Sequence, residues 1–157
     1  MPKLSAIVHT CNDAPRLGRL LETVRCCDEV LIIDDTPDDS VKKVAREHGA
    51  SIRKHIPGVT PGAYSMDAQN EWILCLLPNE SLSQELEASL ATWKERDPKR
   101  EDVFSIAVCE EKGGQRANHR AQVRLINRCC VNWTGNLPPD FEGATVLGGH
   151  LLRINTS

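Results

Sequence analysis

The 157-residue chain lacks an apolar run that approaches the roughly 20 residues a membrane-spanning helix requires, so no transmembrane segment is predicted. It also lacks a surplus of basic residues, because its formal net charge is −3. Nucleic acid would therefore find no general basic surface to bind, and we expect no nucleic-acid partner. The amino-terminal stretch MPKLSAIVHTCND has one lysine and a short apolar run, which is typical of a first strand and not of a signal peptide.

Several catalytic and cofactor-binding motifs are also missing. The turn TCNDAP, which follows the first apolar run, contains neither the glycine pattern of a dinucleotide-binding site nor a P-loop. This absence argues against a dinucleotide-dependent enzyme and against a P-loop ATP enzyme. The sequence contains no G-x-S-x-G nucleophile elbow and no H-E-x-x-H zinc motif.

The seven cysteines do not follow a metal-binding spacing. Cys26-Cys27 and Cys129-Cys130 are adjacent pairs, whereas zinc ligands are usually separated by a few residues so that both thiolates can reach one ion. The number is odd and no export signal precedes it, so we expect reduced thiols in a cytoplasmic protein. Cys75 and Cys109 lie inside apolar runs, where we expect them to pack as small hydrophobic side chains.

The first hundred residues alternate between apolar runs of strand length and segments of helical periodicity. Strands are predicted near residues 4–9, 30–34, 50–55 and 72–77. Helices are predicted over the stretch from Pro15 to Val24, over a stretch around Val41 that stops at Gly49, and from Leu82 to Arg96. A loop at 56–62 precedes a short helical piece at 63–69. Repeated strand–helix units indicate a mainly parallel sheet covered by helices.

After residue 100 the pattern changes. Val103–Cys109 and Ala121–Ile126 are apolar strands joined by the polar stretch EEKGGQRANHR, which predicts an antiparallel hairpin with a long loop. The remaining residues alternate glycine or proline turns with short apolar pieces. We therefore predict a single α/β domain over residues 1–157, with a mixed, mostly parallel sheet. Its antiparallel part should lie within residues 101–157.

Polar side chains are predicted at the carboxyl ends of the strands, where sheets of this kind bind ligands. They are Thr10, Cys11, Asn12 and Asp13 after the first strand, Asp34, Asp35 and Thr36 after the second, and Asn79 and Glu80 after the fourth. The adjacent carboxylates of Asp34 and Asp35 repel each other, so they should face solvent or a donor-rich ligand. The alternative is that they cap the helix beginning near Asp38.

Several stretches, in order, resemble the family 2 glycosyltransferases, which have the GT-A nucleotide-sugar fold. The first is LSAIVHTCND followed by VLIIDDTPDDS, similar to an apolar strand with T-x-N-E and a second strand ending in D-D/S-x-S-x-D. The second, EWILCLLPNESLSQEL, is similar to G-[DE]-W-[IV]-L-F-L-D-A-D-E-x-[IL]-S-x-E-L. The third, QVRLINRCCVNWTGNLPPDFEG, resembles the R-L-F-R and W-x-G-x-[VL]-H-E segments of the lipopolysaccharide-core subgroup. The resemblance covers nearly the whole chain.

This resemblance implies the transfer of a sugar from a nucleotide diphosphate donor to an acceptor hydroxyl. It places nucleotide binding in residues 1–100 and the acceptor side in residues 101–157. The nucleotide-binding residues it implies are Thr10, Asn12, Asp34 and Asp35, with Asp38 or Asp39 also matching the second motif. Because the chain stops soon after GGHLLRI, we expect a minimal GT-A core.

The metal and catalytic positions of the family are occupied by other residue types here. The family's D-x-D motif holds Mg²⁺ or Mn²⁺ on the diphosphate, and its two carboxylates correspond to Leu77 and Asn79. The family's H-E pair falls on Pro138 and Pro139. We therefore expect no tightly bound metal cofactor, with Mg²⁺ or Mn²⁺ required only if activity is retained.

Two hypotheses follow for the function. In the first, the chain is a glycosyltransferase that uses a different carboxylate in place of the usual groups: Glu80, Asp34, Asp35 or Asp140. In the second, it is a catalytically inactive GT-A-like domain that binds a nucleotide, a sugar or a protein partner. In both, nucleotide binding should be weak. The basic residues Arg116, His119, Arg120 and Arg124 either contact a diphosphate or belong to a solvated hairpin loop, and we favour the loop.

Overall fold

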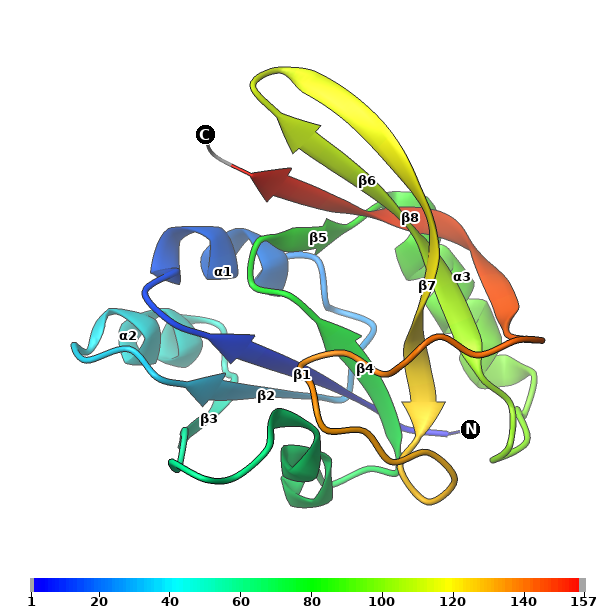
Figure 1. Cartoon of the computed structure of the whole chain (residues 1–157), viewed down its shortest axis with the longest axis horizontal. Helices are drawn as coiled ribbons and strands as arrows, with labels where there is room; N and C mark the ends of the chain where they lie inside the picture. Colours follow the sequence, from blue (N-terminus) through cyan, green and yellow to red (C-terminus); the bar gives the residue numbers. More distant parts are fainter. Residues whose placement is uncertain (1, 156–157) are drawn as a thin grey trace.

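The computed structural model describes residues 2–155 and contains one eight-stranded sheet with the strand order β3-β2-β1-β4-β7-β6-β8-β5 (Figure 1). The strands are β1 (Leu4–Thr10), β2 (Glu29–Asp34), β3 (Ser51–Lys54), β4 (Trp72–Leu76), β5 (Glu80–Leu82), β6 (Phe104–Lys112), β7 (Gln115–Asn127) and β8 (Thr145–Asn155). The helices are α1 (Ala14–Leu21), α2 (Ser40–Glu47), α3 (Gln84–Glu95) and the 3₁₀ helix η1 (Pro61–Asp67).

The four strands before residue 77 run parallel, as predicted. β1 lies between β2 and β4, and β2 pairs with β3. Alternate residues of β1 face opposite sides of the sheet: Val8 packs with Leu17 of α1, and Ile7 packs with Tyr64 of η1. Both faces of β1 are therefore buried, which explains why its sequence is an unbroken apolar run.

The second half of the sheet is mixed and strongly curled. β7 is antiparallel to β4 and to β6, whereas β8 is parallel to β6 and antiparallel to β5. β5 follows β4 after only three residues, yet it lies at the far edge of the sheet, beside β8. Figure 1 shows that the sheet curls so that β5 comes back toward the end of β4. Four of the seven pairings are parallel, so the predicted mixed, mostly parallel sheet is confirmed.

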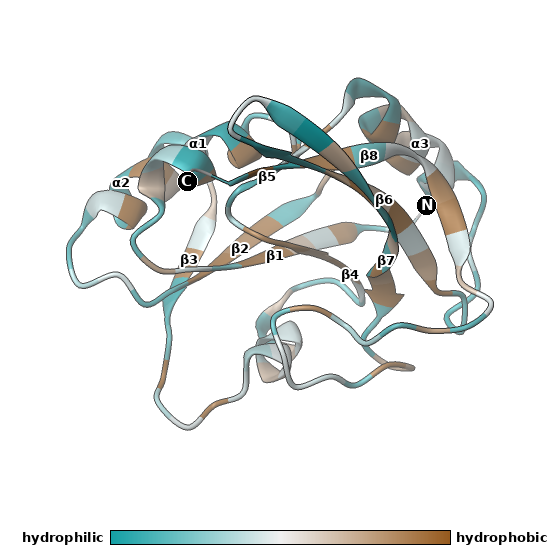
Figure 2. Cartoon of the chain, turned by 45° about the horizontal axis from the view of Figure 1, so that its top comes forward, coloured by the Kyte–Doolittle hydropathy of each residue, from teal (hydrophilic) through white to brown (hydrophobic). Residues whose placement is uncertain are grey.

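The predicted long hairpin loop at residues 110–120 is wrong. β6 and β7 continue to Lys112 and Gln115, and a two-residue turn of Gly113 and Gly114 connects them, with φ of +59° and +79°. Positive φ at both positions is what a tight hairpin turn requires, and glycine adopts it without strain. We call the projecting ends of β6 and β7, residues 110–120, the hairpin arm. Its far end is hydrophilic in Figure 2, and its β7 residues are exposed. Without a buried face, these strands have no apolar alternation that would identify them in the sequence.

Two further corrections concern β5 and β8. The helix predicted from Leu82 begins at Gln84, because residues 80–82 form β5 and Ser83 caps α3 by accepting a hydrogen bond from the Leu86 N–H at 3.1 Å. β8 is one strand of 11 residues, and it was expected only as short apolar pieces between turns. Gly149 lies inside it with φ of +90°, and a Cβ there would lie 2.3 Å from the Leu86 nitrogen. Glycine thus permits β8 to approach α3 closely.

The cysteines fit the interpretation of reduced thiols, since all seven are free. Cys75 and Cys109 are buried, as predicted, and burial raises the pKa of the Cys75 thiol to about 12. None of the helices described within residues 2–155 is both long and apolar enough to span a bilayer.

Candidate functional site

The carboxyl ends of β1 and β2 border a cavity of about 230 Å³. Two of its residues, Thr10 and Asp35, were predicted at strand ends, and the family resemblance implies that they bind a nucleotide. Three others, His9, His55 and Asn136, were not among the predicted site residues. The full lining consists of His9, Thr10, Cys11, Ile33, Asp35, His55, Pro61 and Asn136.

Thr10 and Asp35 have polar groups that the surrounding protein leaves free. Thr10 is only 5% exposed, and its hydroxyl has no hydrogen-bond partner among residues 2–155. Buried hydroxyls are nearly always paired, so this one, whose oxygen has almost no accessible surface, is an exception. Asp35 is exposed, and its backbone N–H donates to the Thr10 carbonyl at 3.0 Å, which joins the two strand ends.

The other two predicted nucleotide-binding residues do not line this cavity. Asp34 is buried, and its carboxylate accepts a hydrogen bond from the Thr36 N–H at 2.8 Å. Asn12 is exposed with φ of +55°, and its N–H donates to the Thr36 hydroxyl at 2.9 Å. Both residues shape the adjoining turns. The alternative that Asp34 and Asp35 cap the next helix is wrong, because α2 has Asp39 at its N-cap position and no side-chain capping bond.

His9 and His55 line the cavity, and the buried Tyr64 ring lies behind both of them. Tyr64 lies 5.9 Å from His9 and 6.1 Å from His55, measured between ring centroids, and its hydroxyl accepts a hydrogen bond from the Ile56 N–H at 2.7 Å. Burial, and to a smaller extent the neighbouring His55, lowers the pKa of His9 to about 4. At neutral pH His9 is therefore uncharged.

The chain segment that carries Asn136 is held against η1 by hydrogen bonds. Arg128 donates hydrogen bonds to the carbonyls of Ser65 at 2.9 Å and Ala68 at 2.5 Å. The Gly62 N–H also donates to the Thr134 carbonyl at 3.4 Å. A Cβ at position 62 would lie only 1.8 Å from the Trp133 carbonyl oxygen, so only glycine fits this contact. Residues from distant parts of the sequence thereby form one preformed cavity.

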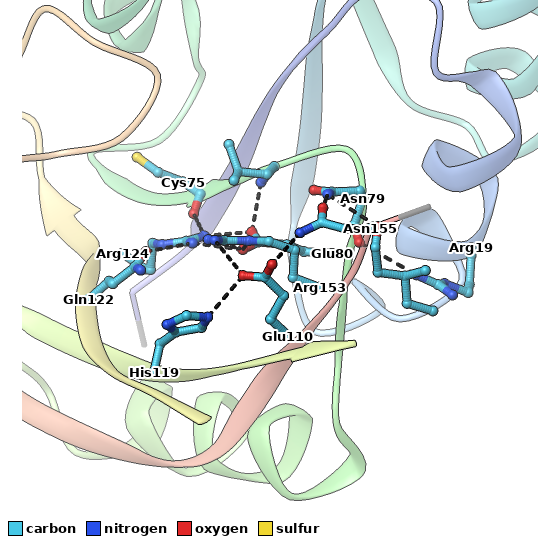
Figure 3. A network of polar contacts seen from close by, with 12 residues as sticks. Arg19, Cys75, Asn79, Glu80, Glu110, His119, Gln122, Arg124, Arg153 and Asn155 are labelled. Carbon is cyan, nitrogen blue, oxygen red and sulfur yellow. Dashed lines mark hydrogen bonds and ion pairs between the residues drawn. The ribbon is translucent and has the colours of Figure 1, made fainter. Parts of the chain in front are cut away.

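A second polar feature lies where the resemblance in sequence places a metal motif (Figure 3). Glu80 is fully buried, and its Oε1 accepts hydrogen bonds from Arg124 Nη1 at 2.6 Å and the Leu77 N–H at 2.8 Å. Its Oε2 accepts from Arg124 Nη2 at 2.7 Å and from Arg153 Nη2 at 3.1 Å. Two guanidinium groups therefore neutralise this buried carboxylate.

Arg124 reaches Glu80 because of a β-bulge. Phe104 pairs with Leu125 and Ser105 pairs with Val123, so Arg124 is an extra residue in β7. Bulges redirect the side chain of the extra residue. The expectation that Arg124 belongs to a solvated loop is wrong, since its side chain is 0% exposed and also donates to the Cys75 carbonyl at 3.2 Å. Arg116, His119 and Arg120 are exposed, but they lie on β7 and not in a loop.

The network extends from Glu80 across β8 and β6 to the hairpin arm. Asn79 Nδ2 donates to Asn155 Oδ1 at 2.9 Å, and Asn155 Nδ2 donates to Glu110 Oε1 at 2.5 Å. Glu110 Oε2 lies 2.9 Å from His119 Nε2. The hydrogen bond from Asn155, followed by that with His119, holds the pKa of the Glu110 carboxyl below its usual range.

These positions do not fit a divalent metal ion. Both carboxylate oxygens of Glu80 already accept hydrogen bonds from arginine, and the Leu77 side chain carries no donor atom. Within residues 2–155, no group of three or more His, Cys, Asp or Glu side chains could hold a metal. Asp140, the other carboxylate considered for catalysis, is exposed and forms an ion pair with Arg120 at 2.5 Å.

Comparisons of sequence give partial matches to glycosyltransferases. The chain is 31% identical over 91 residues to an uncharacterized glycosyltransferase of Rickettsia felis, covering 55% of this chain and 32% of that protein. It is 32% identical over 92 residues to an uncharacterized glycosyltransferase of Rickettsia prowazekii, covering 55% and 31%. The chain spans about a third of the length of these curated relatives. No protein-family model matches it.

Comparison of structures identifies the fold. The crystal structure of TarS from S. aureus superposes with a TM-score of 0.56 at 18% identity, covering 76% of this chain and 24% of TarS. A TarS fragment, residues 1–349, in complex with UDP superposes with a TM-score of 0.55 at 19% identity, covering 75% and 38%. The chain has a GT-A-like fold. The predicted fold class is therefore confirmed, and the similarity in sequence is to glycosyltransferases.

Proposed function

We propose that this chain is a glycosyltransferase domain that binds the nucleotide of a sugar donor in the cavity at the ends of β1 and β2. The observation that carries the proposal is the cavity itself, which is lined by Thr10, by the exposed Asp35 and by Asn136. The fold is shared with TarS, which has been crystallised with UDP and with UDP-GlcNAc. A pyrimidine nucleotide is the ligand class we assign.

The chemistry of the cavity suits a uracil base. The Asp35 carboxylate can accept a hydrogen bond from the imide N–H of the ring, and a hydrogen bond to a charged group contributes about 1.5–3 kcal/mol. His9 is uncharged at neutral pH, and the rings of His9 and His55 both line the cavity. The Asn136 side chain can donate to a carbonyl oxygen of a base and accept from a ring N–H.

We further propose that binding does not depend on a divalent ion. The oxygens of Glu80 are held by Arg124 and Arg153, so this carboxylate is not free to bind Mg²⁺ or Mn²⁺. Without metal, the charge of a diphosphate is poorly compensated. We therefore expect UDP affinity closer to millimolar than micromolar, which corresponds to a binding free energy of about −4 kcal/mol.

A second function is favoured by the same ion network. Glu80 is buried in ion pairs, and Asp140 is paired with Arg120 on the surface. Neither carboxylate lines the cavity, so neither is placed to accept a proton from an acceptor hydroxyl bound beside it. The chain would then be a GT-A-like domain that binds a nucleotide, a sugar or a protein partner without transferring a sugar.

Titration of ¹⁵N-labelled protein with UDP, with and without Mn²⁺, tests nucleotide binding. We expect millimolar affinity, amide shifts at Thr10, Asp35 and Asn136, and no tightening with Mn²⁺. Asp35→Ala should weaken binding at least about tenfold, because it removes a charge-assisted hydrogen bond. Asp39→Ala is the matched control, since it removes an exposed carboxylate that does not line the cavity.

Three outcomes would count against the proposal. No shift near the cavity at millimolar UDP would reject the nucleotide site. Equal effects of Asp35→Ala and Asp39→Ala would reject the role of Asp35. Micromolar binding that needs Mn²⁺ and disappears in Glu80→Gln would show a working metal site. Radiolabelled sugar transfer from UDP-sugars to water or to an oligosaccharide separates the enzyme from the inactive domain.

A further inference from the structure

One side of β7 is open over most of its length. β7 pairs with β6 along one side, whereas on its other side it pairs with β4 only through Leu125, Ile126 and Asn127. Within residues 2–155 no other strand pairs with that side, so residues 115–124 form what we call the open edge of β7. Figure 1 shows this edge on the outer side of the hairpin arm, which projects from the rest of the molecule.

The open edge of β7 is longer than either strand at the ends of the sheet. Those end strands are β3, with four residues, and β5, with three. Short end strands are a common protection, because a row of unpaired backbone N–H and C=O groups can pair with a strand of another chain. Of the 13 residues of β7 only three pair with β4, which leaves ten unpaired on that side, and none of the ten is proline. The open edge therefore keeps the backbone groups that an added strand needs.

The outer part of the open edge already has the geometry of a paired strand. Residues 115–119 pair in unbroken antiparallel register with residues 108–112 of β6, beyond the irregularity between Ile106 and Val108. Successive residues of a strand direct their backbone groups to opposite sides, so pairing with β6 holds the remaining groups in line on the open side. Within residues 2–155, no other backbone segment forms a hydrogen bond with this stretch. An extended peptide can therefore pair with it by addition of a strand to a preformed edge.

The side chains of the open edge select the charge of the partner. The exposed stretch 115–120 carries two arginines and a histidine and no carboxylate, although the whole chain has a net charge of −3. Arg116 and Arg120 are 65% and 81% exposed, and their only ion pairs are surface pairs with Glu111 and Asp140 within residues 2–155. Exposed ion pairs contribute little, so both guanidinium groups can pair with carboxylates of an added strand. A second copy of β7 would instead bring further arginines, and like charges opposite each other destabilise a strand pair.

We propose that the open edge of β7 binds an extended, acidic peptide segment of another protein by strand addition. Backbone pairing holds the segment along the hairpin arm, and its carboxylates form cross-strand pairs with Arg116 and Arg120. This surface shares no residue with the cavity at the ends of β1 and β2. The inference therefore does not depend on the proposed binding of a nucleotide.

Titration of ¹⁵N-labelled protein with a short, end-blocked peptide of alternating threonine and glutamate tests this inference. Amides of residues 115–120 should shift, and alternate amides of this stretch should exchange with solvent more slowly in the complex. Arg116→Gln and Arg120→Gln should each weaken binding about two- to fivefold, the effect of one opposite-charge pair across strands. Arg53→Gln is the matched control, because it makes the same change at an exposed arginine of the end strand β3.

Two further peptides separate strand addition from the attraction of charges alone. The same peptide with every backbone nitrogen methylated keeps its carboxylates but has no N–H to donate, and a peptide with lysine in place of glutamate reverses the charge; neither should bind. Asp35→Ala should bind the acidic peptide as the unmodified chain does. The inference is overturned if the acidic peptide shifts no amide of the open edge at millimolar concentration, if the methylated peptide binds equally, or if all three arginine variants bind alike. It is also overturned if those amides shift with protein concentration alone, because the occupant is then a second copy.

Discussion

Replacing Glu80 by Gln should destabilise the fold more than any change to an exposed ion pair. Arg124 is fully buried, and two of its hydrogen bonds go to the Glu80 carboxylate, at 2.6 and 2.7 Å. In Glu80→Gln this guanidinium keeps the Cys75 carbonyl and the Gln122 side chain as partners, but it loses its counter-charge. Arg153 loses the same counter-charge, although its side chain is 17% exposed and water can compensate in part.

The expected loss is about 3–5 kcal/mol in the free energy of unfolding, the usual effect of removing one partner from a buried ion pair. Typical domains unfold with about 5–15 kcal/mol in total, so the loss is a large fraction. For a chain of this length each kcal/mol lowers the melting temperature by about 2–4 °C, which predicts a decrease of about 10 °C. Urea and thermal unfolding followed by circular dichroism measure both quantities.

Two comparisons make the result specific. Asp140→Asn breaks an exposed ion pair, in which the side chain of Asp140 is 63% exposed and that of Arg120 is 81% exposed. This change should alter the free energy of unfolding by less than about 1 kcal/mol. The double variant Glu80→Leu with Arg124→Met should be more stable than Glu80→Leu alone, because no unpaired charge remains buried. If Glu80→Gln loses no more than Asp140→Asn, the reasoning about the buried network is refuted.

Two other predictions concern pH and packing around the cavity at the ends of β1 and β2. The pKa of His9 falls from 6.5 to about 4 on folding. Its contribution of about 3 kcal/mol to the free energy of unfolding is therefore fully present above pH 6.5 and is lost as the pH falls toward 4. In urea unfolding between pH 4 and 7, the free energy of unfolding should therefore depend less on pH in His9→Gln than in the unmodified chain. An equal dependence on pH in the two proteins would contradict the lowered pKa of His9. Gly62→Ala places a Cβ against the Trp133 carbonyl, so we expect a loss of about 1–3 kcal/mol and weaker UDP binding. Gly18→Ala in α1 is its control, because the nearest atom is a Val44 methyl at 3.7 Å, and it should stabilise the chain by about 0.5–1 kcal/mol.

The parallel half of the sheet could be predicted from the sequence because its signals are local. β1, β2 and β4 are apolar runs buried on both faces, and the segments between them show the spacing of helices. The hairpin arm and β8 gave no such signal. The arm is exposed, and β8 takes its place by pairing with β6, which lies some 40 residues earlier in the chain.

The cavity at the ends of β1 and β2 was predictable only in part, for the same reason. Thr10 and Asp35 could be placed because the ends of parallel strands meet at one edge of a sheet. Asn136 lies about a hundred residues beyond Asp35, and it reaches the cavity only because Arg128 and Gly62 fix its segment to η1. No local pattern in a sequence reports a contact of that kind.

The segment around Leu77 and Asn79 also separates what the sequence decides from what the tertiary structure decides. The sequence by itself determined that Leu77 and Asn79 stand where the resemblance expects carboxylates, because residue type alone decides which atoms a side chain offers. Only the tertiary structure decided the burial and the ion-pair partners of Glu80. The curl of the sheet brings β5 back toward β4, and a bulge in β7 directs Arg124 into the interior. Glu80 is thereby a buried counter-ion, because both of its carboxylate oxygens accept hydrogen bonds from guanidinium groups.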